Sequence, residues 1–275
     1  TISTPASYYL TRSLSGAGNI AGITVNAAPA TIDLMGYTLD GGQPANSSYG
    51  IIVQVQGRVV IKNGVISNWV RGVQQIVAGG GIECVLQDLK IANNSAGGAY
   101  ANGDLLAVRT VFYFNGGDGL TAQGVAIVRD SRSGGNSGFG LNLQFVHSLV
   151  EDSTIDANSG GGIYVSSGSV VRHCVIDSNT GYGISIADRA FIAENSISQN
   201  TGDGVFVTGS GQGRIEGNNI TSNGGYGINA TTGGMFIVKN TARGNSKGNY
   251  NITGSNVAPI DTTGSSTNPW VNFSF

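Results

Sequence analysis

The sequence has few charged residues and no long apolar run. Charged residues make up only 11% of the 275 residues, and the 14 basic side chains are scattered singly along the chain. A nucleic-acid-binding protein would carry a basic stripe, so we expect no nucleic-acid partner. No apolar stretch approaches the ~18 residues that a membrane-spanning helix requires, so we expect no membrane span. The chain starts at Thr1 without a signal-peptide pattern, so we expect that any export signal was removed or never existed.

Glycine, by contrast, is abundant, at 45 residues, and asparagine is frequent. Both residue types favour turns and left-handed backbone, and both disfavour helix. Five prolines without a Gly-x-y period exclude collagen, and 40% hydrophobic residues make the chain too apolar to stay disordered. We therefore expect short strands joined by tight turns.

A repeat runs through the chain. Each copy begins with a glycine followed by an apolar or small residue, and successive copies start 21 to 26 residues apart, at Gly50, Gly72, Gly98, Gly119, Gly140, Gly162, Gly183, Gly204 and Gly227. A pair of apolar residues five positions apart keeps the same spacing. An asparagine follows four successive pairs, at Asn158, Asn179, Asn200 and Asn223.

Apolar residues alternate within each repeat, as in Ile163-Tyr164-Val165, which is typical of strands with one inward side. The signature of a leucine-rich repeat is missing, and a propeller blade would need about twice the period. The pattern predicts an all-β fold, a single-stranded right-handed parallel β-helix (solenoid) of about ten rungs stacked ~4.8 Å apart.

We expect this solenoid to form a single domain. Residues 1–20 would be an N-terminal cap built on Tyr8-Tyr9-Leu10 and Leu14, residues 21–252 would be the coils, and residues 253–275 an extended C-terminal tail. A solenoid core is open at both ends, so both ends need such a cover.

The rung alignment also makes structural predictions. The asparagines after the apolar pairs would turn the backbone and hydrogen-bond from rung to rung. Four isoleucines, Ile155, Ile176, Ile197 and Ile220, would form one buried stack. Cys84 and Cys174 lie four rungs apart, about 19 Å at the ~4.8 Å rung spacing, which exceeds the ~7 Å limit between Cα atoms for a disulfide. We therefore expect two free thiols, with Cys174 buried.

The rhythm is clearest in Ile192-Ala193-Glu194-Asn195-Ser196-Ile197, and it resembles the right-handed β-helix repeats of the pectate-lyase-like superfamily over roughly residues 20–252. That superfamily includes polysaccharide lyases, hydrolases, epimerases, phage tailspikes and adhesins, so the resemblance implies a fold rather than one activity. The Asp-Pro-His-Glu signature of alginate epimerases and the adjacent Asp-Asp pair of polygalacturonases are absent. No catalytic residue of the superfamily therefore carries over to this chain.

One column of the alignment is rich in ionisable residues and comprises Asp88, Thr110, Asp130, Asp152, His173, Glu194, Gly217 and Asn240. We take Asp130, Asp152, His173 and Glu194 as candidate catalytic residues. Carboxylates one rung apart would lie ~5 Å from each other, within the range of paired carboxylates in retaining glycosidases. Such a pair also favours a shared proton or a bound Ca²⁺.

The neighbouring column contains Lys62, Gln87, Arg109, Arg129, Glu151, Arg172, Ala193, Glu216 and Lys239. Arg129 and Arg172 are further catalytic candidates, because each could neutralise a substrate carboxylate. The resemblance to lyases of this fold also implies an arginine that acts as a base beside Ca²⁺. The alternative is a solvated face whose alternating charges hold the rungs in register.

A third column faces outward from the first strand of each repeat and reads Gln74, Tyr100, Thr121, Asn142, Tyr164, Ser185, Phe206 and Asn229. Aromatic rings can pack on pyranose faces, and amides can bond sugar hydroxyls. We therefore expect Tyr100, Asn142, Tyr164 and Phe206 to bind substrate.

These observations favour a secreted or cell-surface β-helix that binds a polysaccharide, with cleavage of lyase or glycosidase type left open. The competing hypothesis is a non-enzymatic structural, fibre or adhesin β-helix. Calcium is the one cofactor that the pattern suggests. The sequence leaves the oligomeric state open.

Overall fold

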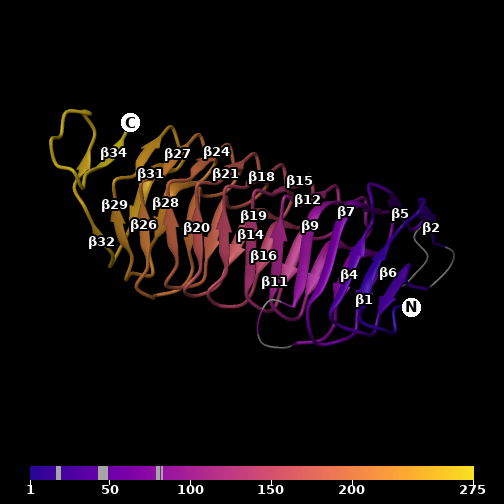
Figure 1. Cartoon of the computed structure of the whole chain (residues 1–275). Coiled ribbons are helices and arrows are strands. Elements are labelled where there is room, and N and C mark those ends of the chain that lie inside the picture. Colours follow the sequence, from indigo (N-terminus) through magenta and orange to yellow (C-terminus); the bar gives the residue numbers. More distant parts are fainter. Residues whose placement is uncertain (17–19, 43–48, 79–80, 82) are drawn as a thin grey trace.

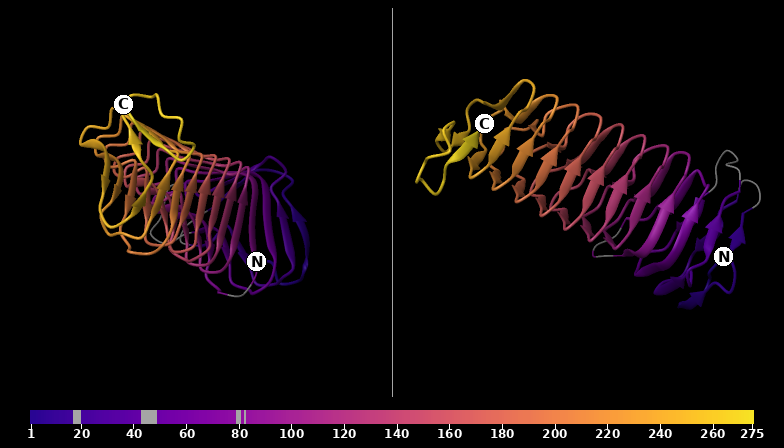
Figure 2. Two further views of the ribbon diagram at one scale, coloured as in Figure 1. Left: turned by 90° about the vertical axis from the view of Figure 1, so that its left-hand side faces the viewer. Right: turned by 90° about the horizontal axis from the view of Figure 1, so that it is seen from above.

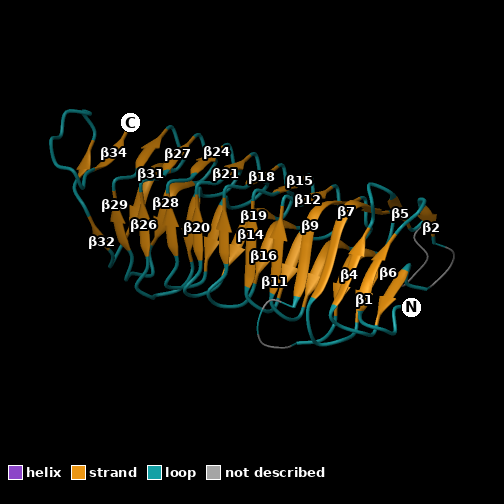
Figure 3. Cartoon of the chain, in the orientation of Figure 1, coloured by secondary structure: helices purple, strands orange, loops and turns teal. Residues whose placement is uncertain are grey.

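The computed structural model describes residues 1–16, 20–42, 49–78, 81 and 83–275. This part of the chain contains strands and no helix, and the strands wind into an elongated solenoid with the two termini at opposite ends (Figures 1 and 3). Each turn of the solenoid visits three faces, and all strand pairs between turns are parallel. No helix in the described residues has the length and apolar character needed to cross a membrane. The expected parallel β-helix is confirmed, with about eleven turns where about ten were predicted.

Face A is the eleven-stranded sheet. Its strands are β3 (Ile23–Val25), β6 (Tyr49–Val53), β8 (Arg71–Gln75), β10 (Gly97–Ala101), β13 (Leu120–Ala122), β16 (Phe139–Leu143), β19 (Gly161–Val165), β22 (Ile184–Ile186), β25 (Val205–Val207), β28 (Tyr226–Ala230) and β31 (Gly248–Ile252). It begins each repeat, so the glycine of each repeat lies on or next to this face.

Faces B and C share the second sheet, and two long strands, β7 (Val59–Ser67) and β9 (Cys84–Ala92), run across both. Face B also contains β1 (Ala6–Tyr9), β4 (Ala30–Asp33), β11 (Leu105–Val108), β14 (Ala126–Arg129), β17 (Leu149–Glu151), β20 (Val170–Arg172), β23 (Phe191–Ala193), β26 (Arg214–Glu216), β29 (Phe236–Val238) and β32 (Asn256–Val257). Face C also contains β2 (Leu14–Ser15), β5 (Thr38–Asp40), β12 (Val111–Tyr113), β15 (Arg132–Gly134), β18 (Thr154–Asp156), β21 (Val175–Asp177), β24 (Ser196–Ser198), β27 (Asn219–Thr221), β30 (Thr241–Arg243), β33 (Ile260–Asp261) and β34 (Asn272–Ser274). The turned views show the turns stacked one behind another (Figure 2).

The core is a set of apolar stacks along the solenoid axis. Ile155, Ile176, Ile197 and Ile220 are register partners on successive turns and are fully buried, as predicted. Both cysteines are buried and free, which confirms that they do not bond to each other. Burial raises the pKa of each thiol to about 12.

The corner between faces C and A contains a ladder of buried asparagines. The Nδ2 atom of Asn158 donates to Oδ1 of Asn179 at 2.9 Å, and the backbone N–H of Asn158 donates to the same oxygen at 3.0 Å. The amide of Asn179 in turn donates to the Ile155 carbonyl at 3.1 Å. The ladder runs through Asn94, Asn115, Asn136, Asn158, Asn179, Asn200, Asn223 and Asn245. It ends where Asn245 donates to the partly exposed Asn249 on β31. The structural role predicted for these asparagines is confirmed.

A second ladder, which was not predicted from the sequence, lies at the corner between faces B and C. It links Asn195, Asn218, Asn240 and Asn272 by the same amide hydrogen bonds. Earlier turns use shorter side chains at this position, where the backbone N–H of Thr110 donates to Ser131 and that of Ser131 donates to Ser153. The backbone therefore turns in the same way whether an amide or a hydroxyl accepts the bond.

The two ends of the solenoid differ from the prediction. Residues 6–9 pair in register with residues 30–33, and Leu14 pairs with Leu39, so the first turn begins inside the expected N-terminal cap. Tyr8, Leu10 and Leu14 still pack against the core. At the other end, β32 pairs with β29 and β34 pairs with β30, so part of the expected tail extends the second sheet. Both differences have the same cause. An unpaired strand edge leaves backbone N–H and C=O groups without partners, and each end strand hydrogen-bonds these groups to a neighbouring turn.

The isoleucine stack generates the first testable prediction. Replacing Ile176 with alanine should lower the free energy of unfolding by about 2–5 kcal/mol, because truncating a packed aliphatic side chain leaves a cavity. Chemical denaturation measures the change. The control is Ser196→Ala on the outward side of β24, which should change stability by less than ~0.5 kcal/mol. Equal effects of the two substitutions would show that the Ile176 column is not the core.

Candidate functional site

The corner column contains four of the candidate catalytic residues. Asp130, Asp152, His173 and Glu194 each follow directly after the last residue of a face B strand, and each has left-handed backbone with φ between 49° and 56°. A left-handed residue projects its side chain out of the corner, so all four side chains are exposed. The structure therefore confirms that these four residues occupy equivalent positions on four successive turns.

Three of these side chains contact one another. His173 lies between two carboxylates, with Nδ1 3.7 Å from Oδ1 of Asp152 and Nε2 2.8 Å from Oε2 of Glu194. The side chains of Asp152, His173 and Glu194 are 56%, 45% and 65% exposed. This line can pass a proton between two carboxylates, but it does so in contact with bulk water.

Two members of the predicted corner column were misplaced. Thr110 and Asn240 are fully buried and lie one residue further along, inside the corner. Arg109 and Lys239 take their places in the corner column, each with positive φ. The error arises because residue type does not mark the left-handed turn, whereas the strand register does. Val108 on β11 is the register partner of both Gln87 and Arg129, so the turn falls at the next residue, Arg109.

Arg129 and Arg172 are joined through Glu151 on the turn between them. Nε of Arg129 is 2.6 Å from Oε1 of Glu151, and Nη2 of Arg172 is 2.6 Å from Oε2. Glu151 is nearly buried, and its hydrogen bonds with Arg172, together with the charges of both guanidinium groups, hold its pKa below the usual value despite the opposing effect of burial. Both arginines thus have a carboxylate partner within the chain.

The described residues contain no group of three or more His, Cys, Asp or Glu side chains that could hold a metal ion. The line of Asp152, His173 and Glu194 spreads along the corner instead of converging on one point. A calcium site needs six to eight oxygen ligands around one centre. The calcium ligand set suggested by the sequence is therefore not assembled in the described residues.

The predicted substrate-binding residues form a continuous column on face A. Tyr100, Asn142, Tyr164 and Phe206 are register partners through the turns that separate them, and all four are partly exposed. The rings of Phe139 and Tyr164 lie 6.4 Å apart, and the guanidinium of Arg71 lies over the ring of Tyr100 at 5.0 Å. The column therefore presents rings and amides along the length of one face.

A cleft of about 500 Å³ lies beside this column near its C-terminal end. Its lining includes Tyr182, Asp203, Phe206, Tyr226 and Lys247, and the rings of Tyr182 and Phe206 are stacked with centroids 4.4 Å apart. Only Phe206 among these was a sequence candidate. The signal for Tyr182, Asp203 and Tyr226 was their position directly before the glycine of a repeat, which Lys247 does not share.

Asp203 holds the cleft in shape. Its Oδ1 accepts a hydrogen bond from the Tyr226 backbone N–H at 2.6 Å, and its Oδ2 accepts one from Nδ2 of Asn229 at 2.8 Å. Asp118 makes the same pair of bonds four turns earlier, to the Phe139 N–H at 2.7 Å and to Asn142 at 2.8 Å. Two aspartates thus orient amide groups of the face A column.

Comparisons with known proteins agree with this architecture. The family model described as "Right handed beta helix region" matches residues 43–191 and 187–265. No curated protein matches the sequence at a significant level.

Several solved structures share the fold at low sequence identity. The A-module of the mannuronan C-5 epimerase AlgE4 from Azotobacter vinelandii is 14% identical, with 98% of this chain and 86% of that chain covered and a TM-score of 0.57. The A-module of AlgE6 from the same organism is 13% identical, with 98% and 89% covered and a TM-score of 0.55. The Dettilon tailspike protein (gp208) is 11% identical, with 98% of this chain and 61% of that chain covered and a TM-score of 0.60.

The pairing of Glu151 generates a prediction about pH. Because its pKa is lower in the folded protein than its ordinary value of 4.5, its contribution to stability is complete above about pH 4.5 and is lost as the pH falls further. Glu151→Gln should therefore lower the free energy of unfolding by about 1–2 kcal/mol at pH 7 and by much less at pH 3. Denaturant titrations at both pH values measure this difference. Glu194→Gln, at a more exposed carboxylate, is the control and should have less than half that effect at pH 7. A constant effect of Glu151→Gln across the pH range would contradict the prediction.

Proposed function

The chain belongs to the right-handed β-helix family, and from that premise we propose that it binds a polysaccharide along face A. The observation that carries the proposal is the column of rings, amides and hydroxyls from Tyr100 to Asn229, with the cleft at Tyr182 and Phe206 beside it. A sugar ring packs on an aromatic face by its C–H groups, while its hydroxyls require amide and carboxylate partners. Face A offers both along one line.

The geometry of a solenoid favours a linear ligand. Equivalent side chains recur every ~4.8 Å along the axis, so successive sugar units of an extended chain meet successive members of one column. Asp118 and Asp203 orient Asn142 and Asn229 in the same way, which supplies amides at two places four turns apart. Two of the structural neighbours are named mannuronan epimerases, which supports a polysaccharide as the ligand class. A polysaccharide ligand also supports a secreted or cell-surface location as part of the same proposal.

Cleavage of a polysaccharide is the second candidate function. The line of Asp152, His173 and Glu194 favours it, because a histidine between two carboxylates can take up and release a proton. The corner between faces B and C lies opposite face A in a three-sided turn, so a glycan held on face A would not reach these groups. Binding is therefore the leading proposal, and cleavage would need a second glycan-binding surface at the corner.

Binding is tested with a panel of neutral and acidic polysaccharides in affinity electrophoresis and calorimetry. We expect one member of the panel to bind, and Phe206→Ala to weaken that binding at least tenfold, which corresponds to ~1.4 kcal/mol. The matched control is Tyr113→Ala, which removes a partly exposed ring from β12 on face C and should leave binding unchanged. Absence of binding across the panel would instead favour the structural, fibre or adhesin alternative.

Asp152→Asn separates binding from cleavage. The substitution keeps the shape of the side chain and removes its charge at an exposed position, so the fold should persist. We expect glycan binding on face A to be unchanged. If the corner cleaves polysaccharide, the release of reducing ends or of unsaturated products should fall at least tenfold, as for a lost general acid or base. Unchanged turnover in this variant would show that the corner column is a solvated charge ladder.

A further inference from the structure

The outward side of face B carries an unbroken apolar column. Its members are register partners on seven successive turns, namely Val60, Val85, Leu106, Ile127, Leu149, Val170 and Phe191. All of them except Val85 are partly or fully exposed, and Phe191 is 37% exposed. We call this set the apolar column. It places large aliphatic side chains at a position that faces solvent.

Strand formation alone does not explain this column, because the other two faces have no unbroken apolar run at the equivalent outward position. On face A, Thr121, Asn142 and Ser185 interrupt the aromatic residues Tyr100, Tyr164 and Phe206. On face C, the exposed Val175 lies between Thr154 and Ser196. All three faces have the same parallel pairing. An apolar strip that runs unbroken over seven turns marks a site of association.

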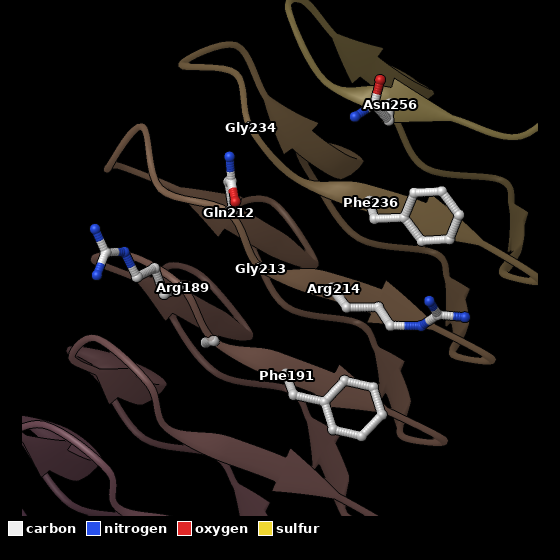
Figure 4. A pocket seen from close by; sticks show the side chains of 9 residues that line it. Arg189, Phe191, Gln212, Gly213, Arg214, Gly234, Phe236 and Asn256 are labelled. Carbon is white, nitrogen blue, oxygen red and sulfur yellow. The ribbon is translucent and has the colours of Figure 1, made fainter.

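The apolar column ends at a charged residue. Arg214 follows Phe191 in the register, and its guanidinium lies over the ring of Phe236 at 4.8 Å. Figure 4 shows the side chains of Phe191, Arg214 and Phe236 projecting side by side from three successive turns. A hollow of about 660 Å³ lies at this end of the face. A partner that covers the apolar column must therefore also accommodate a cation here.

The second outward column of face B carries charges of both signs. Its ionised members lie two residues along the strands from the outward position of the apolar column, and they are Asp33, Lys62, Arg129, Glu151, Arg172 and Glu216. This charged column limits which partner fits, because opposite charges must meet when the apolar columns meet. A second copy of the chain supplies a charged column with the same spacing.

We propose that face B is an interface between two copies of this chain, packed face to face with their solenoid axes antiparallel. The two-fold axis runs along the strand direction between β14 and β17, so that Ile127 packs on Leu149 of the second copy and Leu106 packs on its Val170. In this register Arg129 meets Glu151 of the second copy, and Lys62 meets its Glu216. Each of these four contacts occurs twice by symmetry.

The parallel alternative is disfavoured by charge. A two-fold axis along the solenoid, centred on the apolar column, would place Arg214 against Arg214 of the second copy, and like charges at an interface are destabilising. In the antiparallel arrangement Arg214 faces Val60 of the second copy at the rim of the interface. There Arg214 keeps its ion pair with Glu216 of its own chain. The antiparallel arrangement is therefore the one that covers the apolar column and pairs the charges.

The face is also large enough. Ten overlapping turns at ~4.8 Å and strands of about 10–13 Å give a footprint of about 500–600 Å² per copy, or about 1,000–1,200 Å² in total, which reaches the ~1,000 Å² that a specific interface needs. Face A, with its column of rings and amides, remains exposed on the outside of both copies. The dimer would therefore present two binding faces pointing in different directions.

The experiment is sedimentation velocity of the full chain over a range of concentrations. We expect a dimer of twice the 28.1 kDa chain mass, and we expect Leu149→Lys to weaken the dimer at least 100-fold, because it places a charge at the centre of the apolar interface. The matched control is Thr154→Lys, on the same turn but on the outward side of face C, which should remain dimeric. Circular dichroism of both variants checks that the fold is kept.

The register is tested by exchanging charges. Lys62→Glu should weaken the dimer because it meets Glu216 of the second copy, and the double variant Lys62→Glu, Glu216→Lys should restore it. A monomeric wild type at 100 μM, equal dissociation by Leu149→Lys and Thr154→Lys, or failure of the double variant to recover would each overturn the proposal. Glycan binding on face A is a separate measurement, so failure of the proposed function leaves this result unaffected.

Discussion

The left-handed corner that turns the chain between faces, repeated at the same place on every turn, is the constraint on which the rest of the structure depends. At the corner between faces C and A, a left-handed residue such as Ala157 or Ser178 is followed by a buried asparagine whose amide bonds the next turn. A buried amide must satisfy both its donor and its acceptor groups. Because each asparagine bonds the equivalent asparagine, successive turns are held in exact register.

Register makes each side-chain position into a column, and each face then acquires one chemical character. Face A presents rings and amides, face B presents aliphatic side chains beside alternating charges, and face C presents mainly polar residues. A flat parallel sheet has no pocket of its own, so binding depends on which column a ligand meets. The glycine of each repeat is needed for this close stacking, since a Cβ on Gly162 would lie 2.4 Å from the Gly183 carbonyl oxygen and 2.7 Å from Ile176.

Much of the fold could be predicted because the repeat is periodic. The spacing of the glycines and of the apolar pairs places Ile155 beside Ile176 and Asn158 beside Asn179 by simple subtraction of positions. The predicted corner column was wrong by one residue at Thr110 and Asn240, because residue type does not mark the left-handed turn and both side chains lie inside the corner. The second asparagine ladder was not predicted, because only its last turns use asparagine.

The sequence alone therefore determined the period, the inward and outward positions and the members of most columns, since these follow from local alternation and a constant repeat length. Only the tertiary structure decided which columns lie together on one face and which are separated by a corner. Arg129 and Arg172 look free in the sequence, yet Glu151 binds both from the turn between them. Tyr182, Asp203 and Lys247 come from three turns and meet in one cleft. These contacts depend on the angle of each corner. Long-range backbone geometry sets that angle, and the pattern of residues along the sequence does not contain it.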